Sequence, residues 1–280
     1  TMTVSSTGET EAAAIAIANK TKVLEDRVNG ALTLHAQFPS EETQSAAFVL
    51  HIPQRLAVRL DGQRETSIAN VRAVDLTGPA RGTTKIERVT EHVAGTQNGG
   101  SITISAVSAL KMTLTRTRAR LDALQGDTTL DVQDGDTEIT GSKGALTIEA
   151  RRGDINVRGH KGSVKVTGTD GRVRVSDTSD EVRTDMRRAE VDVELVTGMP
   201  ASLVTSDEEL RVTLRDGAAA HVDAVAANGV IDAADWSLTP SKSSTDARLD
   251  AALGRANGSA PRISLRNQGA NIVLKKSSKK

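Results

Sequence analysis

Apolar and polar residues alternate along much of the chain, in short segments that repeat. Apolar residues separated by a single polar residue recur as Ile155 and Val157, Val164 and Val166, and Val173 and Val175. A period of two is typical of a β-strand with one buried and one solvated face. The pattern therefore predicts that these valines point into a core. It predicts that the charged residues next to them point outward, namely Arg158, Lys165, Arg172 and Arg174.

Glycine marks a longer period of nine residues. The series is Gly126, Gly135, Gly144, Gly153, Gly162 and Gly171. Nine residues are too few for a strand and a crossover helix, which excludes a parallel α/β sheet. Two architectures fit: an antiparallel meander of hairpins, or a solenoid in which two nine-residue segments make one coil. In either one, glycine is expected to supply the unusual backbone angles of the corners.

The composition favours the solenoid. Phe38, Phe48 and Trp236 are the only aromatic residues, although 37% of the 280 residues are apolar. Small aliphatic side chains suit the narrow core of a structure that grows in one dimension. We predict an all-β fold, a single elongated β-solenoid forming one domain over 1–280. Its expected parts are lead-in and capping strands over 1–65, a repeat ladder over 66–235, and a loop with closing strands over 236–280.

The flanks of the repeat are less regular. Residues 9–29 fit either a helix or a strand. Residues 210–232 alternate loosely around an Asn228-Gly229 turn, and 240–260, rich in Ser, Ala, Gly and charge, read as a surface loop with a short helical turn. Residues 261–276 read as two strands around Gly269.

These segments together resemble the bacterial toastrack family of β-strand-repeat proteins, also described as adhesin domains. The matching features are Ile52-Pro53 leading into Leu56–Leu60, the glycine ladder over 126–195, the stretch from His221 to Ile231, and the closing pair around Gly269. The resemblance covers roughly 50–276. It implies a β-repeat fold, no catalytic signature, and a place in the cell envelope.

No residue pattern points to catalysis or to a cofactor. The chain has no cysteine, no G-x-S-x-G elbow and no HExxH motif. Gly78–Lys85 lacks a lysine directly after its second glycine, as a phosphate loop requires, and the Gly-Asp pairs of the repeat are too sparse for a calcium-binding nonapeptide solenoid. We therefore expect no enzyme activity, cofactor or metal. We also expect solvated histidines, which are His35, His51, His92, His160 and His221.

Charge is balanced overall but segregated along the repeat. The 36 Lys and Arg equal the 36 Asp and Glu, which argues against nucleic acid as a partner. Residues 126–149 hold six acids and one lysine, whereas 151–188 hold ten bases and six acids. The simplest interpretation is charge pairing between strands. The functional hypothesis is a basic ladder that binds an anionic envelope polymer or another protein, with Arg151, Arg158, Arg172 and Arg174 as its binding residues; we call these four the predicted arginine ladder.

The expected location is the cell envelope or the extracytoplasmic side, with the cytoplasm as the alternative. The apolar stretch Ala12–Ala18 follows Glu9 and Glu11, where a signal peptide would carry positive charge. Peripheral membrane association and the oligomeric state stay open. The expected function is a non-catalytic, adhesin-like interaction or scaffold module. The alternatives are a self-assembling scaffold of the bactofilin type, a polysaccharide-acting β-helix enzyme, and a barrel that holds a small ligand.

Overall fold

The computed structural model of the chain describes residues 2–6, 20, 22–28, 31–37, 44–61, 65–196 and 199–277. These residues divide into two compact units, Thr1–Pro53 and Gln54–Lys280, where the sequence predicts a single domain over 1–280. The boundary falls close to the start of the family resemblance at residue 50. We describe each unit by itself.

The first unit contains two antiparallel strand pairs. β1 (Met2–Ser6) pairs with β4 (Gln44–Phe48), and β2 (Lys22–Val28) pairs with β3 (Ala31–Gln37). Of the segment 9–29, which fits either a helix or a strand, the part in β2 is therefore a strand. Residues 9–19, 21 and 29 lie outside the described residues.

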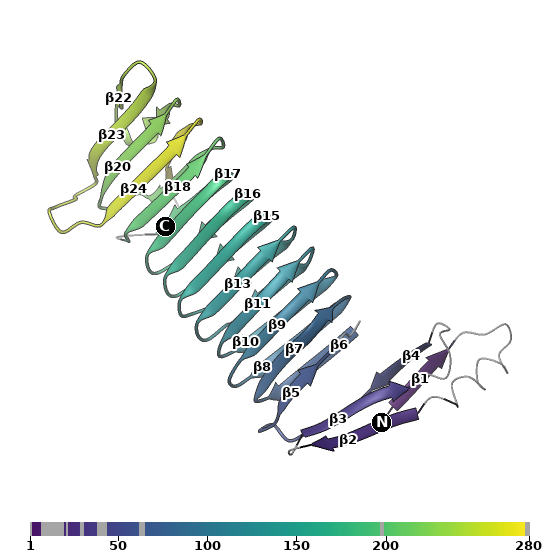
Figure 1. The fold of residues 1–280 in the computed structure, drawn as a ribbon. Helices are drawn as coiled ribbons and strands as arrows, with labels where there is room; N and C mark the ends of the chain where they lie inside the picture. The colour runs from purple at the N-terminus through teal and green to yellow at the C-terminus, as the bar shows by residue number, and fades with distance from the viewer. Residues whose placement is uncertain are drawn as a thin grey trace. The chain divides into compact units, whose positions relative to one another are not determined.

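The second unit is a parallel β-solenoid, as predicted. Each coil adds one strand to each of two walls (Figure 1). The first wall contains β5 (Ala57–Leu60), β7 (Ala73–Ala80), β9 (Val93–Asn98), β11 (Leu110–Thr115), β13 (Thr128–Gln133) and β18 (Ala201–Ser206). The second wall contains β6 (Glu65–Val71), β8 (Thr83–Val89), β10 (Ser101–Val107), β12 (Arg118–Asp122), β14 (Asp136–Thr140) and β19 (Leu210–Arg215). Three long strands pass from the first wall into the second, β15 (Leu146–Arg158), β16 (Val164–Ser176) and β17 (Val182–Leu195).

One coil of the regular region consists of two nine-residue segments. Thr128 lies beside Leu146, and Leu146 lies beside Val164, a step of 18 residues each time. All strand pairs from β5 to β19 are parallel. A meander would make them antiparallel, so the solenoid alternative is confirmed.

The core is the narrow space between the walls, and the predicted strand faces are confirmed. Val157, Val166 and Val173 are completely buried, whereas Lys165 and Arg174 are exposed. Valines and isoleucines from successive coils stack into rows, so that each inward side chain packs on its equivalents in the coils before and after. No large side chain is needed to fill this space, which explains how the solenoid folds with so few aromatic residues.

The repeated glycines have two roles. Gly144, Gly162 and Gly171 have positive φ, as predicted for the corners, and the others are explained by close packing of the coils. At the corners that lead from the first wall to the second, the left-handed backbone belongs to the preceding residue, as in Asp134 (φ 55°) and Arg152 (φ 52°). Gly135 and Gly153, which follow them, are needed because the coils approach closely. A Cβ on Gly153 would lie 2.6 Å from the carbonyl oxygen of Gly135 in the preceding coil. The period of nine arises because the two corners of each coil carry separate glycine stacks, each with a step of 18.

The C-terminal strands do not continue the coil in chain order. β24 (Arg262–Gln268) and β25 (Ile272–Ser277) stack directly on β18 and β19, and β20 (Ala220–Ala227) and β21 (Ile231–Asp232) lie beyond them. β23 (Asp246–Leu253) then pairs antiparallel with β20, and the short β22 (Ser241–Lys242) pairs antiparallel with β23. The predicted surface loop over 240–260 is therefore wrong for 246–253, because the open edge of β20 recruits this segment as a strand. The short helical turn lies earlier, as a 3-10 helix at η1 (Ala234–Trp236).

Candidate binding surface

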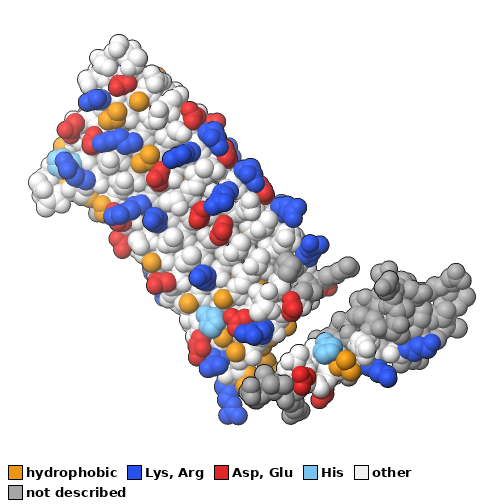
Figure 2. All heavy atoms as spheres, viewed as in Figure 1, with side chains coloured by type: hydrophobic (Ala, Val, Ile, Leu, Met, Phe, Trp, Pro, Cys, Tyr) orange, Lys and Arg blue, Asp and Glu red, His pale blue; other side chains and the backbone are white. Residues whose placement is uncertain are grey.

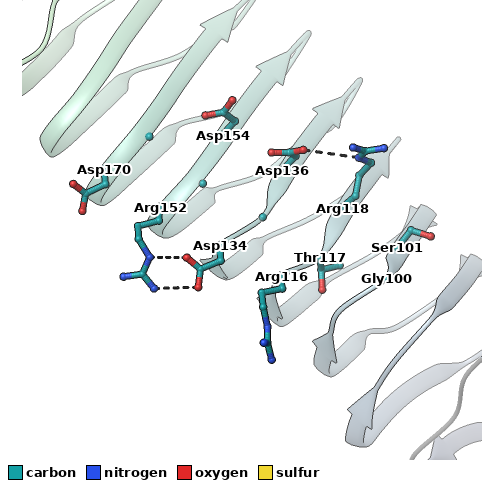
Figure 3. Close-up of a pocket in the computed structure, with 13 residues that line it drawn as sticks. Gly100, Ser101, Arg116, Thr117, Arg118, Asp134, Asp136, Arg152, Asp154 and Asp170 are labelled. Atoms are coloured by element: carbon teal, nitrogen blue, oxygen red, sulfur yellow. Dashed lines mark hydrogen bonds and ion pairs between the residues drawn. The ribbon is translucent and has the colours of Figure 1, made fainter.

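A shallow groove of about 790 Å3 runs along the corner between the two walls, across the coils from residue 100 to residue 171. Its floor is the glycine stack, with Thr117 in place of one glycine. Its sides carry two rows of charged residues, where a row means the residues at one position of successive coils (Figure 3). We call this feature the corner groove; its lining is Gly100, Ser101, Arg116, Thr117, Arg118, Asp134, Gly135, Asp136, Arg152, Gly153, Asp154, Asp170 and Gly171.

The row before the glycines alternates strictly in charge. We call it the charged corner row; its members are Arg116, Asp134, Arg152, Asp170, Arg188 and Asp207, all with positive φ. Arg152 donates two hydrogen bonds to Asp134, of 2.6 and 3.0 Å, and Arg188 donates two to Asp170, of 2.8 and 3.1 Å. Successive coils lie ~4.8 Å apart, so equal charges at this position would repel each other. Because the signs alternate, neighbouring residues of the row form bidentate ion pairs instead of repelling each other.

These ion pairs shift the acidity of their members. The hydrogen bond from Arg152 lowers the pKa of Asp134 below its usual value, and the hydrogen bond from Arg188 does the same to the pKa of Asp170. Both carboxylates are therefore ionised at neutral pH. Arg116, at the other end of the groove, donates to the side-chain oxygen of Asn98 at 3.1 Å rather than to a carboxylate.

The row after the glycines has a basic start and an acidic middle. Its members along the groove are Ser101, Arg118, Asp136 and Asp154, followed by Arg172 and Glu190. Arg118 lies 3.8 Å from Asp136, and Figure 3 shows the two side chains pointing toward each other. Asp136 and Asp154 are direct neighbours of the same sign. The groove therefore offers two arginines at one end and carboxylates one and two coils farther along.

The sequence fixes this geometry through a local charged–glycine–charged triplet at the corner. The first residue takes the left-handed conformation, which costs a non-glycine residue ~1–2 kcal/mol. The glycine allows the coils to approach, and the third residue begins the second-wall strand with its side chain outward. Asp134-Gly135-Asp136 and Arg152-Gly153-Asp154 are two such triplets. The sequence analysis did not predict this site, because a charged residue before a glycine is common in any turn. The feature that could have revealed it is the alternation of positive and negative residues at steps of 18 along the sequence.

The members of the predicted arginine ladder do not stack on one another. Arg151 lies in the first wall and Arg158 in the second, and Arg172 and Arg174 occupy two further rows of the second wall. Arg151 donates to Glu149 at 2.6 Å, Arg158 lies 3.6 Å from Asp177, and Arg172 donates to Glu190 at 2.7 Å. Arg174 lies between Asn156 and Asp192. No two of the four share a row. Binding of a partner by these residues stays a prediction.

The segregation of charge along the sequence is explained by the stacking of coils. The acidic segment 126–149 lies between coils that supply arginines: Arg118 and Arg120 face Asp136 and Glu138 from the preceding coil, and Arg152 faces Asp134 from the following one. Figure 2 accordingly shows blue and red side chains interspersed over the visible face of the solenoid. Most of these pairs are exposed, so each one contributes little to stability.

One histidine departs from the prediction that all five are solvated. His160 is 2% exposed and lies at the opposite corner of the coil from the groove. Its Nε2 donates to the carbonyl oxygen of Gly144 at 2.9 Å, so in the neutral ring Nδ1 accepts a hydrogen bond from the hydroxyl of Ser142 at 2.8 Å. Burial lowers the pKa of His160 below 6.5. The prediction is wrong for this residue because the stack of coils encloses the corner.

The described parts of the chain offer little support for a metal site, a phosphate loop or a membrane-spanning helix. No group of three or more His, Cys, Asp or Glu is placed there to hold a metal ion. Gly78–Lys85 lies in the strands β7 and β8 and the turn between them, without the helix that a phosphate loop needs. Within the same residues there is no helix of the length and apolarity that a membrane crossing requires.

A two-walled parallel β-solenoid with side chains in fixed rows defines a class of repeat proteins that act as scaffolds or interaction modules. The family model for Toastrack DUF4097 matches residues 61–233, more than half of the chain. The chain therefore belongs to the toastrack family, which confirms the resemblance seen in the sequence. No curated protein and no solved structure matches it significantly. A non-catalytic scaffold or interaction module is the function that this fold supports in general.

Proposed function

We propose that this protein is an adhesin-like interaction module of the cell envelope, and that its corner groove holds an extended polypeptide segment carrying charges of both signs. The observation that carries the proposal is the order of charges along the groove. Arg116 and Arg118 flank one end, while Asp136 and Asp154 follow at one and two coils from Arg118. The envelope location is supported by the family resemblance.

The spacing of the groove matches an extended chain. Arg118 and Asp154 are two coils apart, ~9.6 Å at ~4.8 Å per coil, and an extended strand covers that length in about three residues. A partner with an acidic residue and a basic residue three positions later places one against Arg118 and the other against Asp154. A polymer of acidic groups only meets Asp136 and Asp154 on the same path, so repulsion offsets its attraction to the arginines.

The test uses a fluorescent peptide of repeated Glu-Ser-Gly-Lys, with poly-glutamate and poly-lysine peptides of the same length for comparison. Fluorescence anisotropy at low salt should show the tightest binding for the mixed peptide, and binding should weaken as salt screens the charges. Asp154→Lys should weaken binding of the mixed peptide at least tenfold. Asp250→Lys is the matched control, because Asp250 is also an exposed strand aspartate but lies on β23, away from the groove.

Two outcomes contradict the proposal. Equal or tighter binding of poly-glutamate means that the partner is a purely anionic polymer, and equal losses in the two aspartate variants mean that the groove is not the site. The location has its own test. Recovery of the native protein only in the cytosolic fraction of its cells contradicts the envelope assignment without bearing on the groove.

A further inference from the structure

The two ends of the solenoid differ in how well their edge strands are protected against pairing with a further strand. At the C-terminal end, the first wall finishes in the two-residue strand β22, which carries Lys242 and follows Pro240. The second wall finishes in the two-residue strand β21 and η1, where the indole nitrogen of Trp236 donates to the carbonyl oxygen of Lys275 at 3.2 Å. Short edges, lysine, proline and covering segments are the usual means of blocking strand addition.

The N-terminal end is less protected in its described residues: β5 is a short strand of four residues, but neither β5 nor β6 contains a lysine or a proline. β5 pairs only with β7, and β6, seven residues long, pairs only with β8. Their other edges carry backbone N–H and C=O groups that no described strand satisfies. Arg59 and Glu65 are the only charged residues in the two strands.

The core also opens toward this end. Ile68 of β6 is 8% exposed, whereas Ile86 and Ile104, at the same position of the next two coils, are completely buried. Val58 and Leu60 of β5 pack on the core but are only partly buried. Directly before β5, the large apolar side chain of Leu56 is exposed as well.

We propose that a second copy of this chain closes the N-terminal end, in a head-to-head dimer in which β5 and β6 pair with their own equivalents. An open end of this kind presents two strand edges, separated by the thickness of the core. A single peptide strand can satisfy only one of them, whereas a second copy brings two edges at the matching separation. A two-fold axis perpendicular to the walls sets β5 against β5 and β6 against β6, each pair antiparallel.

Charge permits this pairing. Each end strand carries a single charged residue, Arg59 in β5 and Glu65 in β6, so repulsion between equivalent strands is small, and the chain as a whole has a net charge of zero. Because the C-terminal end is blocked, assembly stops at two copies, which separates this arrangement from the filaments expected of a bactofilin-type scaffold. The inference is independent of the partner proposed for the corner groove.

Two equally exposed apolar side chains provide a matched test. Leu56 is 44% exposed next to β5, and Val230 is 43% exposed near the other end of the solenoid. Sedimentation velocity of the full chain should give twice the monomer mass. Leu56→Lys should shift the protein to the monomer mass while its circular dichroism spectrum stays that of the folded chain, and Val230→Lys should leave the dimer intact.

Cross-linking identifies the end that pairs. The chain has no cysteine, so a single Ser67→Cys on exposed β6 can react only with itself in another copy. A short bis-maleimide should join Ser67→Cys into dimers, and it should leave the control Ser241→Cys, on β22, monomeric on a denaturing gel. A monomeric wild type at all concentrations, filaments, or cross-linking through Ser241→Cys instead of Ser67→Cys would each overturn the proposal.

Discussion

Replacing Val166 by aspartate tests the buried face of the solenoid most directly. Val166 is completely buried and lies between Ile148 and Thr184 in the stack of coils. Loss of the valine side chain removes ~1.5–3 kcal/mol of burial. The new carboxyl, with an ordinary pKa of about 3.9, must also be neutralised at pH 7, which costs ~4 kcal/mol at ~1.4 kcal/mol per pKa unit. A domain stability of ~5–15 kcal/mol leaves little margin for such a loss.

The adjacent residue supplies the control. Lys165 points outward between Thr147 and Arg183, so Lys165→Asp puts a carboxylate beside an arginine and should leave stability almost unchanged. Thermal unfolding followed by circular dichroism at pH 7 should show Val166→Asp unfolded or strongly destabilised. The loss of stability of Val166→Asp relative to wild type should be smaller near pH 4.5, because neutralising the carboxyl costs less free energy there. Equal melting temperatures of the two variants at pH 7 would refute the assigned strand faces.

Three further predictions concern the corners and the exposed arginines. Gly153→Ala should lower the melting temperature more than Gly258→Ala, because the first brings a Cβ against the neighbouring coil while the second meets open space; equal melting temperatures would contradict the close-approach role. Since burial lowers the pKa of His160, the unfolded chain binds a proton first as pH falls below about 6.5. Urea titrations should therefore show wild type losing stability relative to His160→Gln between pH 7.5 and pH 5, and parallel pH profiles would argue against this. Changing all four residues of the predicted arginine ladder to Gln should reduce co-sedimentation with an anionic polymer at low salt but not at high salt. Equal co-sedimentation of wild type and this variant at low salt would mean that the four arginines form intramolecular ion pairs and do not bind the polymer.

The amino-acid sequence by itself determined the class of fold. The alternation around Val164 and Val166 assigns each residue to the core or to solvent, because a strand has a period of two. The glycines at steps of nine, from Gly126 to Gly171, mark the corners and exclude a crossover helix. These are local properties, and a short window of sequence contains them completely.

Only the tertiary structure decided which residues become neighbours. Asp134 and Arg152 are 18 residues apart, and Ala201 and Ile263 are 62 apart, yet both pairs lie side by side. No local pattern states that β24 inserts between β18 and β20, that β25 inserts between β19 and β21, or that 246–253 forms an antiparallel strand, because these choices depend on which edges remain open after the regular coils have stacked. The corner groove, the pairing of the arginines and the burial of His160 all follow from that stacking. The sequence contains their residues, but contact between successive coils creates the site.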